Sequence, residues 1–159
     1  PSTARIGKTI STDSRPMLRN KYVRLVLALL ASGVLSFAVG VAIGSVTSML
    51  HCEGERLACN IDVAVGAYAT MILAALGPLI FGVTLAVATN QKALLGATLV
   101  LLAPLMTGYL LAESEGWRYV GFYPYPALRT FLVLFVPPVA TILTQCFVLR
   151  TAMRRGILT

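Results

Sequence analysis

The sequence predicts an all-α integral membrane protein with four transmembrane helices, kinked at prolines, and two short external loops. Hydrophobic residues form 57% of the chain and charged residues only 12%, whereas a soluble domain of this size carries about 25% charged residues. The mean hydropathy is +0.82. Apolar runs of about 20 residues, the length that crosses a bilayer as a helix, recur along the chain. The composition therefore excludes an ordinary soluble globule, and it is the opposite of a disordered tail.

The predicted spans cover residues 25–50, 63–89, 93–112 and 130–149, which together form a transmembrane domain at 25–150. A basic N-terminal tail at 1–24 precedes this domain, and a short tail at 151–159 follows it. No span contains Lys, Arg, Asp, Glu or His. Continuous rather than alternating apolarity indicates helices and not barrel strands. We expect the first span to stay in the chain, because its run is too long for a signal peptide, and Pro1 to follow a removed initiator methionine.

Basic residues are divided unequally between the two sides of the membrane. The side that holds both termini carries Arg5, Lys8, Arg15, Arg19, Lys21, Arg24, Lys92, Arg150, Arg154 and Arg155, and the other side carries Arg56, Arg118 and Arg129. Because Lys and Arg concentrate in cytoplasmic segments, we expect both termini in the cytoplasm and the chain in a plasma membrane, of the bacterial inner-membrane type. The net charge of +7 then reflects orientation. A nucleic-acid partner is not expected, since that requires a basic folded face with interleaved aromatic residues.

Cys52 and Cys59 lie in the first predicted external loop. An oxidising compartment favours a structural disulfide between them. Catalytic redox use is the alternative, although the chain lacks a Cys-x-x-Cys pair. Cys146, in the cytoplasmic half of the fourth span, is predicted to be a small buried apolar residue.

The second predicted external loop is rich in aromatic residues and contains two prolines that prevent a regular helix. Its candidate partner-binding residues are Trp117, Arg118, Tyr119, Phe122, Tyr123 and Tyr125. Trp, Tyr and Arg contribute much of the binding energy of protein interfaces. The alternative is a plug at the level of the lipid headgroups, where amphipathic rings gather.

Small residues recur every four positions in the first two spans. The first series is Ala28, Ser32, Ser36, Gly40, Gly44 and Ser48, and the second is Gly66, Thr70, Ala74, Gly82 and Ala86, with Pro78 between Ala74 and Gly82. Small side chains let helices approach closely in lipid, so Ser36, Gly40, Gly44, Gly66 and Gly82 are candidate packing residues. A four-residue step turns about 40° around a helix. The first series therefore requires either a right-handed crossing or neighbours on two sides, and we expect one such neighbour from another chain.

Prolines interrupt three of the four predicted spans, at Pro78, Pro104 and the pair Pro137 and Pro138. Each releases a backbone carbonyl about four residues earlier. Kinked packing of the helices is one interpretation of this pattern. A substrate cavity at the kinks is the other.

The residue types that are missing from the spans narrow the function. Proton-coupled transporters, pumps and charge-selective channels place ionisable groups in the bundle. His51 is the single histidine, which disfavours a haem with two histidine ligands, a His-based metal site and a Ser-His-Asp triad. We therefore expect no catalytic residue, cofactor or metal.

Two functional hypotheses remain. The first is a non-catalytic small membrane subunit that packs against and stabilises or regulates a larger membrane complex, with other membrane subunits and lipid as partners. Self-association into a homo-oligomer is also compatible with the small-residue faces. The second is an oligomeric transporter or channel component for an uncharged or lipid-like ligand. The polar residues that would line its path are Tyr68, Thr70, Thr107, Tyr109, Thr141, Thr144 and Gln145.

Overall fold

The computed structural model describes the backbone of residues 20–51, 56–114 and 132–158, and the side chains of residues 20–49, 63–110 and 132–158. Four helices occupy most of these ranges: α1 (Lys21–His51), α2 (Arg56–Val87), α3 (Gln91–Ser114) and α5 (Val136–Arg154). Each is long and apolar enough to cross a membrane. The predicted all-α fold with four candidate membrane spans is therefore confirmed for the described part of the chain.

The helix bounds differ from the predicted spans at both ends of each helix, and the largest differences are in α2 and α5. α2 begins at Arg56, so residues 56–62, which we predicted as external loop, are helical. Residues 132–134 are helical and end in a turn at Phe135, and α5 begins at Val136 and continues to Arg154, beyond the predicted end of the span. Pro137 and Pro138 lie in the first turn of α5, where their missing amide hydrogens remove no bond from the rest of the helix.

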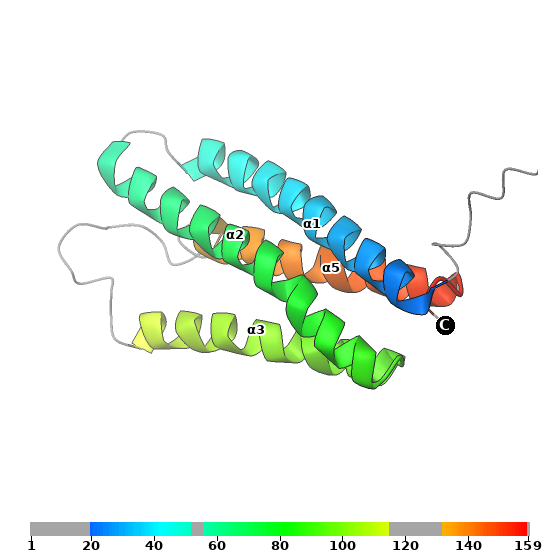
Figure 1. Cartoon of the computed structure of the whole chain (residues 1–159). Coiled ribbons are helices and arrows are strands. Elements are labelled where there is room, and N and C mark those ends of the chain that lie inside the picture. Colours follow the sequence, from blue (N-terminus) through cyan, green and yellow to red (C-terminus); the bar gives the residue numbers. More distant parts are fainter. Residues whose placement is uncertain (1–19, 52–55, 115–131, 159) are drawn as a thin grey trace, which may run out of the picture.

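The four helices form a bundle in which α2 and α5 occupy the middle. α1 and α3 each pack on both α2 and α5, and they lie on opposite sides of this pair (Figure 1). In the protein, 39% of the α5 span is buried, against 17% of the α1 span, although α5 is the least apolar of the four. A helix that is shielded from lipid by its neighbours can carry more polar side chains than a lipid-facing one.

One end of the bundle, which we call the basic end, holds the beginning of α1, the α2–α3 turn and the end of α5 (Figure 1). Its described basic residues are Lys21, Arg24, Lys92, Arg150, Arg154 and Arg155. Large buried side chains fill the half of the bundle near this end; the largest are Phe81, Leu85, Leu94 and Leu149, each at most 2% exposed. The other half is packed mainly by glycine, serine and threonine, so the helix backbones come closest there.

Local hydrogen bonds fix three helix ends at the basic end. The Oδ1 atoms of Asn20 and Asn90 accept bonds from the first turns of α1 and α3, at 3.0 and 2.6 Å, as N-cap residues do. After α5, Gly156 adopts a positive φ of 68°. The amides of Gly156 and Ile157 then donate to carbonyls in the last turn of α5, which is a Schellman turn. This turn directs the chain back along the bundle, where Leu158 is buried.

Candidate functional site

The small-residue series of the first span lies on the side of α1 that packs against α2 and α5. Ser32 and Ser36 are fully buried and Gly40 is buried. Toward the basic end, Ala28 lines a groove against α5, whereas Gly44, toward the other end, lines a groove against α2. The two neighbours that a four-residue step requires are therefore both helices of the same chain. A second chain is not needed to explain this series, and the expected neighbour from another chain stays a prediction.

Gly40 lies where α1, α2 and α5 meet. A Cβ atom at this position would overlap Oγ1 of Thr141 in α5 and would lie 2.5 Å from Cγ2 of Thr70 in α2. A Cβ atom on Gly44, one turn further along α1, would lie 3.8 Å from the Pro137 ring, which is an ordinary van der Waals contact. The absent side chain at Gly40 thus sets the closest approach of the three helices.

A glycine of α1 covers a carbonyl that a proline of α2 releases. Pro78 has no amide hydrogen, so the carbonyl of Ala74 lacks its helical hydrogen bond. A Cβ on Gly33 would lie 3.3 Å from this carbonyl oxygen and 3.1 Å from Cγ of Pro78. Glycine therefore lets α1 close over the polar backbone group, where a Cα–H···O contact can form.

The same arrangement recurs between α2 and the chain before α5. Pro137 releases the carbonyl of Val133, and a Cβ on Gly66 would lie 2.5 Å from that oxygen. Further along α2, the second predicted series leaves the interface: Gly82 faces only the flexible end of Leu29, and Ala86 is exposed. A strict four-residue step drifts around the helix, so its last members turn toward lipid.

A buried amide joins three helices at the centre of the bundle. Gln145 of α5 is 0% exposed, and its Nε2 donates to Oγ of Ser36 at 3.0 Å and to the carbonyl of Leu73 at 3.1 Å. Its Oε1 is buried without a conventional hydrogen bond, and it lies where a Cβ on Gly77 would be. Gly77 therefore provides the space that the amide occupies.

Sequence reasoning assigned Gln145 to a transport path and did not single out Gly33 or Gly77. Two sequence features could have indicated this site: Gln145 is the lone amide in an apolar span, and Gly77 directly precedes Pro78. The other members of the proposed path are dispersed. Tyr68 is 66% exposed and Thr107 is exposed on α3. The hydroxyls of Thr70, Thr107, Thr141 and Thr144 each donate to a carbonyl of their own helix.

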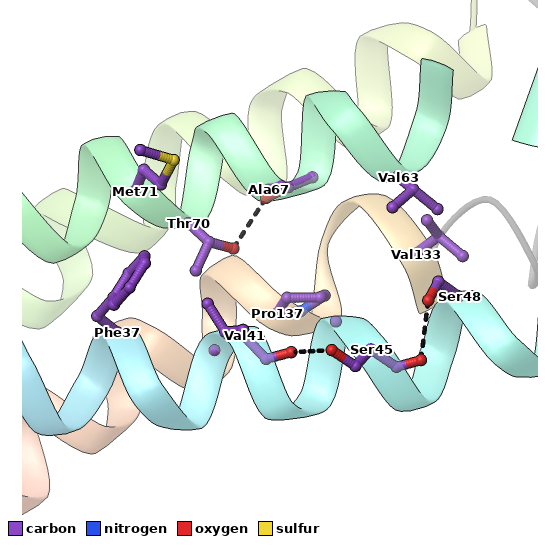
Figure 2. Close-up of a pocket in the computed structure, with 13 residues that line it drawn as sticks. Phe37, Val41, Ser45, Ser48, Val63, Ala67, Thr70, Met71, Val133 and Pro137 are labelled. Atoms are coloured by element: carbon purple, nitrogen blue, oxygen red, sulfur yellow. Dashed lines mark hydrogen bonds between the residues drawn. The ribbon is translucent and has the colours of Figure 1, made fainter. Parts of the chain in front are cut away.

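Figure 2 shows a groove of about 190 Å³ between α1 and α2, in the half of the bundle away from the basic end. Gly40, Gly44 and Gly66 line it, with Val133 and Pro137 between the two helices. The lining side chains include no ionisable group. The Oγ atom of Ser45 donates to the carbonyl of Val41, within its own helix. The groove thus offers an apolar, small-residue surface.

The outer half of α3, defined here as residues 103–110, packs on the bundle much less than its beginning. Leu94 and Leu101 are buried, whereas Gly108, two turns beyond Leu101 on the same side, has open space within 4 Å of a Cβ atom. In this half, Leu105 is partly buried against the core, and Tyr109 forms an edge-to-face pair with Phe135, with ring centroids 5.3 Å apart. This half of α3 therefore lies at the margin of the bundle.

Pro104 makes the outer half of α3 polar on its exposed face. It releases the carbonyl of Val100, and both residues are exposed. Among the described residues, no glycine has this carbonyl as a near neighbour, and the Thr107 hydroxyl donates to the carbonyl of Ala103 instead. Of the three residues with such a carbonyl, Ala74 is half-buried, Val133 is buried and Val100 is exposed among the described residues.

Several predicted site residues lie outside the described side chains. These are Cys52, Cys59, Trp117, Arg118, Tyr119, Phe122, Tyr123 and Tyr125, together with the basic tail up to residue 19. Cys146 is half-buried, carries a free thiol and packs against the apolar core. In the part of the chain that the structure describes, His, Cys, Asp and Glu do not gather in groups of three or more that could bind a metal ion.

Comparison of the chain with protein-family models, curated proteins and solved structures finds no match. A functional assignment therefore depends on the residues and geometry of this chain. The features that carry it are the glycine-covered carbonyls, the buried amide and the exposed face of α3.

A substitution pair at two glycines tests the carbonyl contacts. We expect Gly66→Ala to lower the free energy of unfolding by about 1–3 kcal/mol, because the new methyl group would meet a backbone oxygen that cannot move aside easily. Gly96→Ala is the control, since nothing lies within 4 Å of its Cβ position. It should leave stability unchanged or raise it by up to about 1 kcal/mol through helix propensity. Thermal unfolding in detergent, followed by circular dichroism, measures both; equal effects would contradict the close packing at Gly66.

A double-mutant cycle between Ser36→Ala and Gln145→Leu tests the central amide. We expect a coupling energy of about 0.6–1.7 kcal/mol, the range of hydrogen bonds between membrane helices. The control cycle pairs Ser36→Ala with Thr144→Val, because the Thr144 hydroxyl bonds within its own helix, to the carbonyl of Ala140. Reversible unfolding in mixed micelles gives the four free energies of each cycle. Additive effects of Ser36→Ala and Gln145→Leu would show that the amide does not join α1 and α5.

Proposed function

We propose that this protein is a non-catalytic membrane subunit that packs against another membrane protein through α3 and thereby stabilises or regulates a larger complex. The observation that carries the proposal is the exposed position of Val100 and Pro104 on α3, where the proline leaves the Val100 carbonyl without its helical hydrogen bond. The equivalent carbonyls at Ala74 and Val133 are covered by glycines of neighbouring helices. A backbone carbonyl left uncovered in hydrocarbon is costly, which favours a partner helix over lipid at this position.

The side chains around this carbonyl suit a helix–helix contact. Gly96, Ala103 and Thr107 are exposed, and their spacing of seven and four residues places them on one face of α3. In contrast, the exposed positions of α1 are mostly bulky, as at Leu30, with 61% exposure, and Val34, with 73%. Small residues permit close approach of a second helix, whereas branched side chains suit contact with lipid tails.

The remaining features extend this proposal. The basic end would face the cytoplasm, with both termini there, because Lys and Arg mark the cytoplasmic side. On the opposite side, a Cys52–Cys59 disulfide would order the α1–α2 connection in an oxidising compartment. The aromatic segment from Trp117 to Tyr125 directly follows α3 in sequence, so it would add contacts to the same partner. The setting that these features fit is a bacterial inner membrane.

Purification of the full chain from its native membrane in mild detergent tests the proposal. We expect a stoichiometric partner with the unmodified chain, and loss of most of that partner with Ala103→Leu, because the larger side chain would hold the two helices apart. Ala86→Leu is the matched control. It makes the same change at an exposed position of α2, and it should retain the partner. Mass spectrometry of the purified sample measures the stoichiometry.

A clean monomer of the unmodified chain would contradict the proposed subunit role. Equal retention by both variants would show that α3 is not the contact surface. If the stoichiometric partner is a second copy of this chain, the larger complex is a homo-oligomer. Solute flux through proteoliposomes that contain this chain alone would instead favour the transporter hypothesis.

A further inference from the structure

A second groove, of about 430 Å³, lies between α1 and α5 at the basic end. Its walls are Leu27, Ala28 and Ala31 of α1 and Phe147, Val148, Thr151 and Ala152 of α5. The groove is open because α1 and α5 each carry an alanine there, Ala28 and Ala152. Larger side chains at these positions would fill the space. Leu27 and Phe147 are 48% and 70% exposed, so the groove is open along the side of the bundle that would face lipid.

Two arginines stand at the end of this groove. Arg24, in the first turn of α1, is half-buried, and Arg155, which caps α5, is exposed. The Schellman turn at Gly156 brings Ile157 into the same lining. From Arg24 to Ala31 the groove follows α1 for about 10 Å, at 1.5 Å per residue. One end is therefore cationic and lies at the membrane surface, and the rest is apolar and lies at the depth of the acyl chains.

The described charged side chains around this end are basic. The described basic side chains there are Lys21, Arg24, Lys92, Arg150, Arg154 and Arg155, and the described side chains include no Asp or Glu. Guanidinium groups bind phosphate oxygens through paired, charge-assisted hydrogen bonds. Basic pockets between membrane helices at the cytoplasmic surface recognise anionic headgroups. The occupant must therefore be an amphiphile with a negative head and an apolar tail.

We propose that this groove is a binding site for one anionic glycerophospholipid, whose phosphate contacts Arg24 and Arg155 and whose acyl chain lies along Ala28, Ala31 and Phe147. The lipid would join the beginning of α1 to the end of α5 at a place where the protein itself leaves space. This proposal does not rest on the subunit role argued above, because the groove and the exposed face of α3 belong to different helices.

The test uses the purified full chain in a neutral detergent, titrated with phosphatidylglycerol or with phosphatidylcholine of the same acyl chains. A ligand that binds only the folded state raises the unfolding temperature in proportion to its saturation. We expect a saturable rise with phosphatidylglycerol, and one lipid adduct in native mass spectra. We also expect a much smaller rise with phosphatidylcholine, and none with inorganic phosphate.

Matched variants locate the site. Arg155→Gln removes the exposed guanidinium, and Ala31→Leu fills the apolar part of the groove without a change in charge; each should weaken phosphatidylglycerol binding about ten-fold or more. Arg150→Gln and Ala38→Leu make the same changes at exposed positions outside the groove, and each should bind as the unmodified chain does. Arg155→Lys, which keeps the charge without the paired donors, should give an intermediate affinity.

Four results would overturn the proposal. Equal stabilisation by the two lipids would show that the groove selects no headgroup charge. An equal loss for Arg150→Gln and Arg155→Gln would indicate diffuse attraction to the basic end. Stabilisation by inorganic phosphate alone would indicate an anion site that needs no acyl chain, and unchanged binding by Ala31→Leu would lead to the same conclusion.

Discussion

The bundle depends on covering the backbone carbonyls that its prolines release. In water such a carbonyl would simply be hydrated, but in hydrocarbon it needs a partner from the protein. Gly33 and Gly66 lie against the carbonyls of Ala74 and Val133. A glycine can cover a carbonyl in this way only if its backbone lies directly against the carbonyl oxygen. Covering the carbonyl therefore constrains the distance between the two segments. At Pro78 and Pro137, the carbonyl four residues before the proline thus lies against a glycine of another helix, and this contact limits how the two segments pack.

This constraint divides the bundle into two halves with different packing. Away from the basic end, glycines and hydroxyl residues bring α1, α2 and α5 together at backbone distance. Near the basic end, Phe81, Leu85 and Leu149 fill the space between the helices. Gln145 lies between these two regions, where it donates to both α1 and α2. α3 packs on the region of large side chains through Leu94 and Leu101.

The fold class was predictable from the sequence because a membrane span is recognised from a local apolar run. The pairing of helices depends on contacts between residues far apart in the sequence, so it was not predictable in the same way. The four spans and the inward faces at Ser36 and Gly40 follow from composition and spacing. The start of α5 was missed because an apolar run does not show where a proline pair begins a helix. The bond from Gln145 to Ser36 joins residues 109 positions apart, and no local pattern encodes such a distance. The groove at Arg24 was equally hidden, since it forms only where the first and last helices meet.

The central place of α5 has a consequence for the order of assembly. α5 is the last of these four helices to leave the ribosome. It carries Gln145, whose amide joins α1 to α2, and it follows Val133, whose carbonyl Gly66 covers. Chains are made from the N-terminus at a limited rate, so α1, α2 and α3 are synthesised before their common neighbour. The space that Ser36 and Gly77 border around the amide is therefore filled only once α5 has been made.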